Sequence, residues 1–336
     1  KLVFENRGSD SIALSESDRA VSFFQNNSRQ NVILVVVDPP LDRSFNDSDG
    51  NLYGLVKSPA TLSGGSNLSI SVVYEITSMG HSGPELRRDL AEDLSKINRS
   101  ELISEYCAGS GTLLTEDPKI RAKAFEIKGN RTKVLDIVEA FIVFFRANVT
   151  YDSGSEQPKY PNETLSSLSG DCDDQSILFI TMCRILGIPA YLQVGCVLKE
   201  DLNSDETVWD GHVRLHTEGV GWHGWSMVYI PPWGWLPVDL TYVTDRSGTI
   251  PEIEHPGIYQ EYIVLDQNVS KYDYVGESRD TRQMVLNSAL YIYLEEKAVK
   301  MSPETPPGPW SLVLQVVAAS SIVFVFLYTW RRSRAG

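Results

Sequence analysis

The chain is short of positive charge. Of its 336 residues, 30 are Lys or Arg and 44 are Asp or Glu, which gives a formal net charge of −14. Nucleic-acid binding depends on clustered lysines and arginines that neutralise phosphates. The composition therefore argues against a nucleic-acid partner.

Histidine is also scarce, with five in the chain. His212 and His216 are four apart, but Gly211–His216 has the pattern of a strand. In a strand, positions i and i+4 lie too far apart to hold one ion easily. The sequence thus predicts no metal and no cofactor, and it contains no internal repeat or low-complexity segment. Its hydrophobic content of 42% is enough for more than one domain.

One cysteine stands at the predicted start of an apolar helix. Gly170–Ser176 leads into the apolar stretch Ile177–Leu186, and Gly187–Pro189 ends it. The first turn of a helix has unpaired backbone N–H groups and the positive end of the helix dipole, which both favour a thiolate. Cys172 is therefore the predicted nucleophile.

A hairpin pattern follows further along the chain. His223–Tyr229 alternates as a strand, and Pro231–Gly234 is a turn cluster that returns the chain antiparallel. Pairing His223 with Asp239 centres the hairpin on this turn, so the two side chains are predicted to be cross-strand neighbours. Cys172, His223 and Asp239 then have the order of a nucleophile, its base and the residue that orients the base.

These segments resemble the two signature blocks of the transglutaminase-like superfamily, Gly170–Pro189 and His223–Asp239. The resemblance extends upstream to Asp117–Lys128, Thr132–Tyr151 and Tyr160–Leu165, and it covers roughly residues 113–275. It implies an α+β, papain-like fold with N-terminal helices, in which the nucleophile helix packs on an antiparallel sheet. It also implies that the Cys172 thiolate attacks a peptide or carboxamide carbonyl and forms a thioester.

The chain departs from the family pattern at three places. Gly224 replaces the usual Ala after the histidine, Met227 replaces a common acidic residue, and Asp239-Leu240-Thr241 replaces Asp-Pro-Thr. Whether the thioester passes to water or to an amine stays open. Hydrolysis is the preferred prediction, because water needs no binding site of its own.

Tryptophans gather around the predicted site. They either pack the core of the hairpin or form the walls of a cleft for an extended peptide or glycan. These cleft candidates are Trp222, Trp225, Trp233 and Trp235.

The first 83 residues are predicted to form a separate small β-sandwich, because short apolar or alternating runs are separated by turn residues. These runs are Leu2–Glu5, Ala20–Phe24, Val32–Val37, Leu52–Val56 and Leu68–Ile76. Pro84–Cys107 is predicted to be a charged amphipathic helix within a linker over 84–112. Residues 113–300 would then form the catalytic domain with a C-terminal extension.

Eight Asn-x-Ser/Thr sequons predict an N-glycosylated, extracellular protein, since about two are expected by chance. Their asparagines are then expected at the surface. They are Asn26, Asn46, Asn67, Asn98, Asn130, Asn148, Asn162 and Asn268.

The C-terminal segment Trp310–Trp330 carries no charge and is predicted to be a single transmembrane helix. Residues 301–309 then form a Pro-rich spacer, and the basic residues 331–336 form a short cytoplasmic tail. This predicts a single-pass cell-membrane protein with its N-terminal part outside. Lys1 in place of Met suggests a removed signal peptide, and the tail resembles that of archaeal surface proteins.

The four cysteines allow two arrangements. Cys183 and Cys196 form a disulfide, or both are buried free thiols, and the sequence favours neither.

A second class of function stays open, a non-catalytic surface or accessory subunit of a cell-envelope or membrane complex that uses the same fold as a scaffold. An occluded Cys172 would favour this hypothesis, whereas an open cleft at Cys172 would favour an enzyme with an extracellular protein or peptide substrate.

Overall fold

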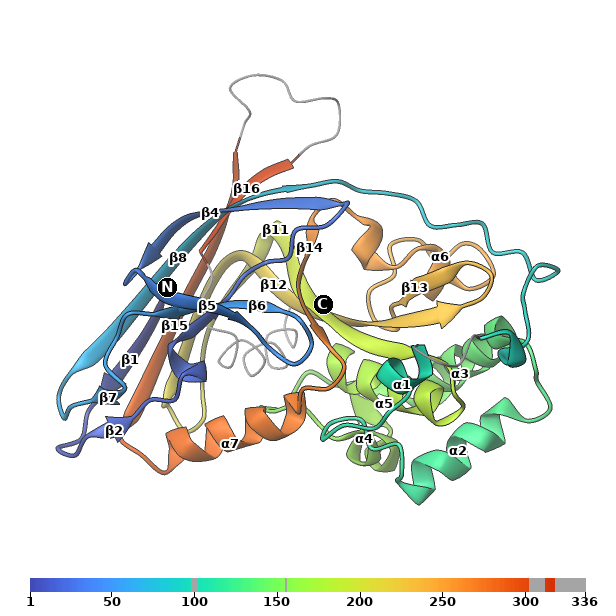
Figure 1. Ribbon diagram of the computed structural model, residues 1–336, viewed down its shortest axis with the longest axis horizontal. Coiled ribbons are helices and arrows are strands. Elements are labelled where there is room, and N and C mark those ends of the chain that lie inside the picture. Colours follow the sequence, from blue (N-terminus) through green and yellow to red (C-terminus); the bar gives the residue numbers. More distant parts are fainter. Residues whose placement is uncertain (98–101, 155, 302–311, 318–336) are drawn as a thin grey trace.

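The structure, a computed structural model, describes residues 1–97, 102–154, 156–301 and 312–317. In these residues a nine-stranded sheet of order β1-β8-β16-β15-β12-β11-β14 runs through the molecule, with β13 paired to β12 and β4 paired to β8 (Figure 1). Its strands are β1 (Leu2–Asn6), β4 (Gln30–Asp38), β8 (Asn67–Ser78), β11 (Ala190–Val208), β12 (Val213–Ile230), β13 (Gly234–Val238), β14 (Ile263–Val269), β15 (Leu290–Met301) and β16 (Leu312–Val317).

Three smaller sheets accompany the main one. Two of them come from the N-terminal part of the chain, and the third is a parallel pair beside the helices. They are β2 (Ile12–Ala13) with β7 (Thr61–Leu62), β3 (Ala20–Ser22) with β6 (Leu52–Val56) and β5 (Leu41–Asn46), and β9 (Thr150–Tyr151) with β10 (Ser169–Gly170).

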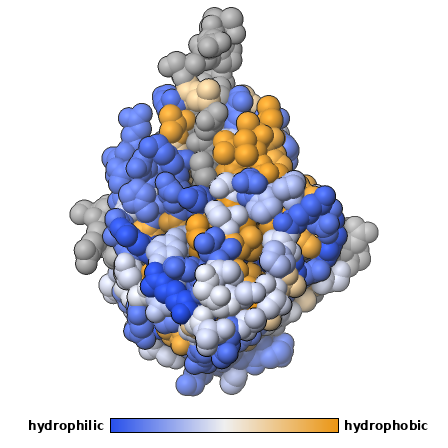
Figure 2. Space-filling view, turned by 90° about the vertical axis from the view of Figure 1, so that its left-hand side faces the viewer, coloured by the Kyte–Doolittle hydropathy of each residue, from blue (hydrophilic) through white to orange (hydrophobic). Residues whose placement is uncertain are grey.

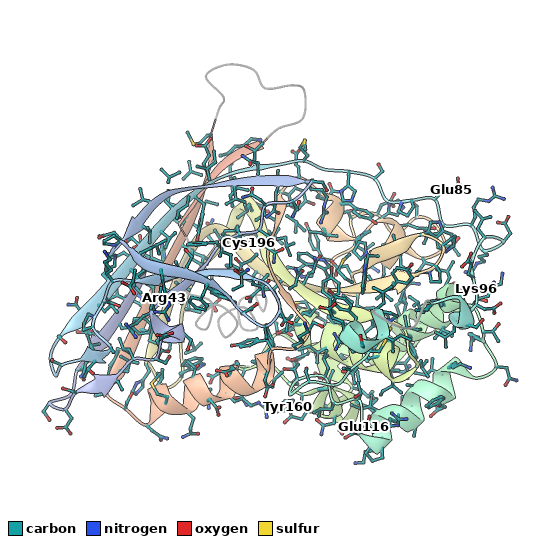
Figure 3. All side chains as sticks on the ribbon, in the orientation of Figure 1. Arg43, Glu85, Lys96, Glu116, Tyr160 and Cys196 are labelled. Atoms are coloured by element: carbon teal, nitrogen blue, oxygen red, sulfur yellow. The ribbon has the colours of Figure 1, made fainter. Side chains whose placement is uncertain are left out.

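Most helices gather at one end of the molecule, at the lower right of Figure 1, around the buried helix α5. The helices are α1 (Leu102–Tyr106), α2 (Pro118–Lys128), α3 (Val134–Asn148), α4 (Pro161–Ser167), α5 (Cys172–Ile185), α6 (Pro251–Glu254) and α7 (Tyr274–Leu286), with 3-10 turns at Ser17–Arg19, Leu94–Lys96 and Gly257–Tyr259. Side chains fill the space around α5 (Figure 3). On the side of α5 that faces α3, Phe179 packs edge to face against Phe141 and Phe145.

The N-terminal strands do not form the separate sandwich that the sequence predicted. β1 pairs with β15, with Leu2 opposite Leu294, so the N-terminal and C-terminal strands share one sheet. Outside the main sheet, β2 pairs with β7, and β3, β5 and β6 form a three-stranded sheet. The Tyr74 hydroxyl joins this three-stranded sheet to the main sheet by donating to the Ser22 carbonyl. The domain boundaries at residues 83, 112 and 300 stay a prediction. The main sheet nevertheless contains strands from both sides of residue 83.

The long helix predicted over Pro84–Cys107 is absent from the residues described there. A short 3-10 turn (Leu94–Lys96) and α1 take its place, and Asp93 forms an isolated bridge with Lys133. Residues 98–101 lie outside the described residues. Local periodicity is a weak signal for helix when tertiary contacts decide the backbone path.

The predicted transmembrane helix is wrong. No helix within the described ranges has both the length and the apolar character needed to cross a bilayer, which contradicts the single-pass membrane location. Leu312–Val317 instead forms β16, hydrogen-bonded to β8 on one side and β15 on the other. A β-branched apolar run suits a central strand as well as a helix, and periodicity alone does not separate the two. The rest of the predicted helix, most of the spacer and the basic tail lie outside the described residues.

β4 exposes apolar side chains along its length. Ile33–Val36 are all exposed, and within the described residues β4 pairs only with β8. The face of the molecule in Figure 2 has an apolar area in its upper half. An edge strand of this kind keeps unpaired backbone groups available.

Asp266, on β14, is a buried carboxyl within this sheet, only 1% exposed. Burial raises its pKa to about 7, and the nearby Glu296 adds to the rise, although the Ser22 hydroxyl acts in the opposite direction. A carboxyl whose pKa is raised by folding stabilises the folded state at low pH. This stabilisation is lost as the pH rises from about 4 through about 7.

We therefore predict that Asp266→Asn changes the pH dependence of stability. The variant should match the wild type in free energy of unfolding at pH 4 and exceed it at pH 8 by roughly 2–4 kcal/mol, because the wild type must ionise a buried group. Urea unfolding at both pH values measures this difference. Asp245→Asn, at an exposed position, is the matched control. Parallel pH profiles for wild type and Asp266→Asn would contradict the prediction.

Candidate active site

Helix α5 begins at Cys172, as the sequence predicted. Asp171 is its N-cap and accepts a hydrogen bond from the backbone N–H of Asp174 at 3.3 Å. The helix ends before Gly187, whose φ of 78° suits a residue without a side chain. Cys172 therefore lies at the positive end of the helix dipole.

His223 and Asp239 form a buried pair. The Nε2 atom of His223, on β12, lies 2.6 Å from Oδ2 of Asp239, which directly follows β13. Both side chains have at most 1% of their surface exposed. With Nε2–H donating to the carboxylate, Nδ1 is the nitrogen that can exchange a proton with a thiol.

The register of this hairpin differs from the prediction. Ser226 pairs with Val238, so Asp239 continues the ladder opposite Trp225 rather than His223. His223 and Asp239 are thus diagonal neighbours on one face, which is still within reach of a hydrogen bond. The turn after Ile230 lies where the Pro-rich cluster predicted it.

The first turn of α5 lies directly against β12 at His223. A Cβ atom built on Gly224 would lie 3.3 Å from the Cβ of Asp173. One turn further along, the Ser226 hydroxyl donates to the Ser176 carbonyl at 3.5 Å. The neighbour of Cys172 in the chain therefore touches the neighbour of His223.

Two carboxyl groups, those of Asp171 and Asp173, lie beside Cys172. Potential ligand atoms of Asp171, Cys172 and Asp173 lie within 4.8 Å of one another, and Asp173 Oδ2 accepts a hydrogen bond from the Tyr274 hydroxyl at 2.7 Å. Burial raises the pKa of Asp171 well above its usual range, and the neighbouring Asp173 raises it further. A protonated Asp171 removes one negative charge that would otherwise disfavour the thiolate.

Asp174 is held from another direction. Its Oδ1 accepts the backbone N–H of Lys159 at 2.6 Å, and Lys159 Nζ lies 3.7 Å from its Oδ2. Burial nevertheless raises the pKa of Asp174 to about 7, with Asp173 as the next cause. The segment before α4 is thus fastened to the start of α5.

Residues 121–240 match the family model of the transglutaminase-like superfamily. The chain contains a transglutaminase-like domain. A candidate cysteine protease from Cytophaga hutchinsonii has a similar fold, with a TM-score of 0.52, 16% identity and 94% of each chain covered. The search of curated proteins gives no match.

Two other solved structures resemble the chain more weakly. The periplasmic domain of TgpA from Pseudomonas aeruginosa bound to ethylmercury has a TM-score of 0.31 and 17% identity, covering 72% of this chain and 89% of its own. Red sea bream transglutaminase has a TM-score of 0.32 and 14% identity, covering 72% of this chain and 45% of its own.

The contacts of the transglutaminase-like domain account for one of its departures from the family pattern, Gly224, and show the surroundings of another, Leu240. Gly224 leaves room for Asp173, because the 3.3 Å separation of a Cβ there is tighter than most contacts allow. Leu240 lies in a turn in which Asp239 Oδ1 accepts the N–H groups of Thr241 and Tyr242, at 3.1 and 2.8 Å. This turn leaves Asp239 Oδ2 free to bind His223.

Among the predicted cleft residues, Trp225 is in ring contact with the histidine. Its ring centroid lies 5.8 Å from that of His223, and its indole N–H donates to Gln193. Trp222 is buried, stacks on Phe24 and donates to Glu296. Trp235 packs among tyrosines, and Trp233 is half-buried. Tryptophans on both faces of the strand thus serve packing.

The other predicted positions fall into two groups. Cys183 and Cys196 are both buried and neither is in a disulfide, so the possible bridge between them is absent (Figure 3 labels Cys196). Asn26, Asn46, Asn67, Asn130 and Asn148 are exposed, whereas Asn162 and Asn268 are half-buried and Asn98 lies outside the described residues. Glycosylation itself stays a prediction.

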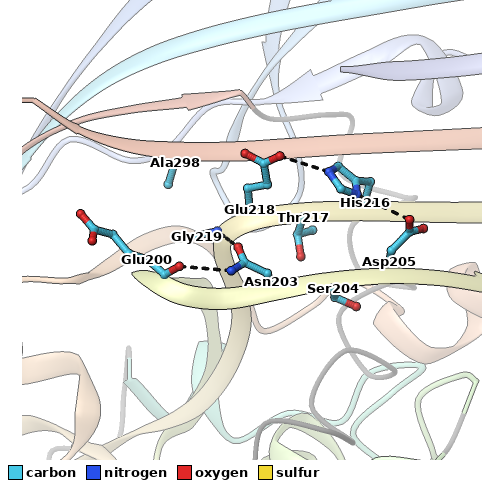
Figure 4. A pocket seen from close by; sticks show the side chains of 9 residues that line it. All are labelled: Glu200, Asn203, Ser204, Asp205, His216, Thr217, Glu218, Gly219 and Ala298. Atoms are coloured by element: carbon cyan, nitrogen blue, oxygen red, sulfur yellow. Dashed lines mark hydrogen bonds and ion pairs between the residues drawn. The ribbon is translucent and has the colours of Figure 1, made fainter.

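The candidate triad is closed to solvent. Cys172 is 2% exposed, and His223 and Asp239 are fully buried. A groove of about 610 Å³ lies elsewhere, between β11 and β12, where Asn203 donates to the Glu200 carbonyl and accepts the Gly219 N–H (Figure 4). None of the triad residues lines it.

Sequence reasoning missed several residues of this site. Tyr274, which holds Asp173, has no local signal because it lies 101 residues away in the chain. Gln193 and Tyr242 are equally unmarked, although Tyr242 follows the recognised Asp239 by three residues. The acidic residues after Cys172 can be read from the sequence, but their burial could not be predicted from it.

We predict that Asp239→Asn slows alkylation of Cys172 at neutral pH by at least about tenfold. An amide in place of the carboxylate loses the charge that stabilises imidazolium and can turn an N–H toward Nε2. The rate is measured with iodoacetamide and peptide mapping, alongside thermal unfolding. Asp245→Asn, an exposed change in the segment after β13, should alkylate at the wild-type rate. An unchanged rate in folded Asp239→Asn would exclude the orienting role.

Proposed function

We propose that the chain is a cysteine hydrolase that cleaves peptide or carboxamide bonds through Cys172, His223 and Asp239. The observation that carries the proposal is the buried 2.6 Å contact between His223 and Asp239, on a strand that lies against the first turn of α5. A nucleophile at a helix start beside an oriented imidazole is the arrangement that acyl transfer requires.

In this proposal His223 acts through Nδ1. It takes the proton of the Cys172 thiol as the sulfur attacks the carbonyl, and then gives that proton to the leaving amine. Asp239 holds the imidazole and stabilises its charged form. The backbone N–H of Cys172 at the start of α5 would donate to the oxyanion. Water then cleaves the thioester, with His223 again as base.

A second candidate is a non-catalytic scaffold with the same fold. The observation that favours it is the closure of the triad, because a substrate carbonyl needs access to sulfur that is only 2% exposed. Its partner would then bind elsewhere on the surface. The two hypotheses differ in the reactivity of the cysteines rather than in the fold.

The order in which the thiols react separates the two functions. Cys107 is more exposed than Cys172, whereas Cys183 and Cys196 are buried, and burial raises the pKa of Cys183 well above its usual range. If Cys172 is a catalytic thiolate, it should react before Cys107 with a thiol-directed amide-mimic probe, despite its burial. Competition labelling of the full chain followed by peptide mapping measures this order.

Two variants accompany this measurement. Cys172→Ala should abolish both fast labelling and peptide hydrolysis, and His223→Ala should slow labelling of Cys172 without changing that of Cys107. Labelling of Cys107 first, with no hydrolysis by the wild type, would favour the scaffold.

A further inference from the structure

Tyr242 lies in direct contact with His223. The centroids of their rings are 5.7 Å apart, with an edge-on angle of 66°. His223 is fully buried, whereas Tyr242 is half-buried, so Tyr242 touches the imidazole and also reaches the surface. A movement of the Tyr242 side chain would therefore change the exposure of His223.

The backbone of Tyr242 is fixed. Its N–H donates to Asp239 Oδ1 at 2.8 Å, and its carbonyl accepts the N–H of Gly257 at 2.8 Å. The next residue, Val243, forms a bridge with Pro256. The segment is thus anchored on both sides, and any movement is left to the side chain, whose ring packs directly against Gly257.

The hydroxyl of Tyr242 is held from outside the segment. Lys199 Nζ donates to it at 2.8 Å, and the Tyr262 hydroxyl lies 3.2 Å away. Lys199 also lies over the Tyr262 ring, 4.1 Å from its centroid. We call Lys199, Tyr242 and Tyr262 the latch.

The latch borders a surface hollow. Lys199 and Tyr262 both line a cavity of about 350 Å³ at the irregular stretch of β11, and this cavity shares Glu200, Gly219 and Ala298 with the groove of Figure 4. The same two side chains therefore face a space that a ligand can enter and hold the ring that covers His223.

We propose that Tyr242 is a positioning residue and a movable cover of His223, and that Lys199 and Tyr262 hold it closed. In the closed state the ring supports the imidazole and keeps water and ligands from it. Breaking the hydroxyl contacts lets the side chain rotate about its fixed backbone and exposes His223. The hollow beside the latch is the place where a bound substrate would break them.

The biological role of this cover rests on the proposed function. The cover itself can be tested by chemical modification of His223, without measuring hydrolysis. The reagent is diethyl pyrocarbonate, which modifies accessible neutral imidazoles, and the modified histidines are identified by peptide mapping of the full chain. His216, with a side chain 44% exposed at a distant part of β12, is the internal reference.

Tyr242→Phe keeps the ring and removes the latch. Loss of a hydrogen bond should raise the open fraction, so modification of His223 should become about fivefold to tenfold faster while His216 is unchanged. Lys199→Met should act in the same direction. Tyr293→Phe, which removes a remote tyrosine hydroxyl that also accepts from a cationic side chain, Arg7, should match the wild type.

Tyr242→Ala removes the cover itself, and modification of His223 should then approach the rate of His216. The supporting role has its own readout, the pH midpoint of Cys172 alkylation, which should shift in Tyr242→Ala and return to the wild-type value in Tyr242→Phe. Thermal unfolding confirms that each variant is folded. Equal His223 rates in wild type and Tyr242→Phe overturn the latch, and equal rates in wild type and Tyr242→Ala overturn the cover.

Failure of the proposed function gives a different result. If Cys172 is not a catalytic thiol, peptide hydrolysis is absent and Cys107 is labelled first, whatever the His223 rates show. If only the cover is wrong, hydrolysis depends on Cys172 and the Tyr242 variants leave His223 modification unchanged.

Discussion

The bond between His223 and Asp239 is the constraint around which this site is arranged. A carboxylate without exposed surface must have its lone pairs satisfied, or its burial costs several kcal/mol. Here Oδ2 binds the imidazole and Oδ1 accepts the N–H groups of Thr241 and Tyr242. The turn after β13 therefore has to close tightly, and this closure brings the Tyr242 ring against the imidazole.

The start of α5 presents the opposite problem, since three carboxyl groups crowd one helical turn. A helix N-terminus favours negative charge, but burial and mutual repulsion oppose it. The three carboxyl groups have different surroundings in the structure. Asp173 accepts a hydrogen bond from Tyr274 and Asp174 is held by Lys159, whereas burial raises the pKa of Asp171 well above its usual range. The charge next to Cys172 thus depends on whether Asp171 is protonated. Long-range contacts from α7 and from the segment before α4 hold the other two carboxyl groups.

The sequence predicted the local parts of this site and missed the long-range ones. The start of α5 and the turn after Ile230 follow from capping and turn residues, which act within a few positions. The five N-terminal runs are likewise strands, because alternation reports a half-buried surface. Their partners were not visible, since pairing of Leu2 with Leu294 has no local signal. The C-terminal apolar run was misread for the same reason, as a strand between two neighbours and a membrane helix share one composition.

The burial of the candidate triad has two opposite consequences for its chemistry. A thiolate, an imidazolium and a buried carboxylate interact more strongly when water is excluded, so burial strengthens the chemistry that Cys172 and His223 would perform. The same burial prevents a substrate carbonyl from reaching the sulfur. A site that is both preorganised and reachable therefore needs a part that moves without disturbing the His223–Asp239 bond. The Tyr242 side chain is suited to this role, because the Tyr242 backbone holds Asp239 while the Tyr242 hydroxyl contacts Lys199 and Tyr262 beside a surface hollow.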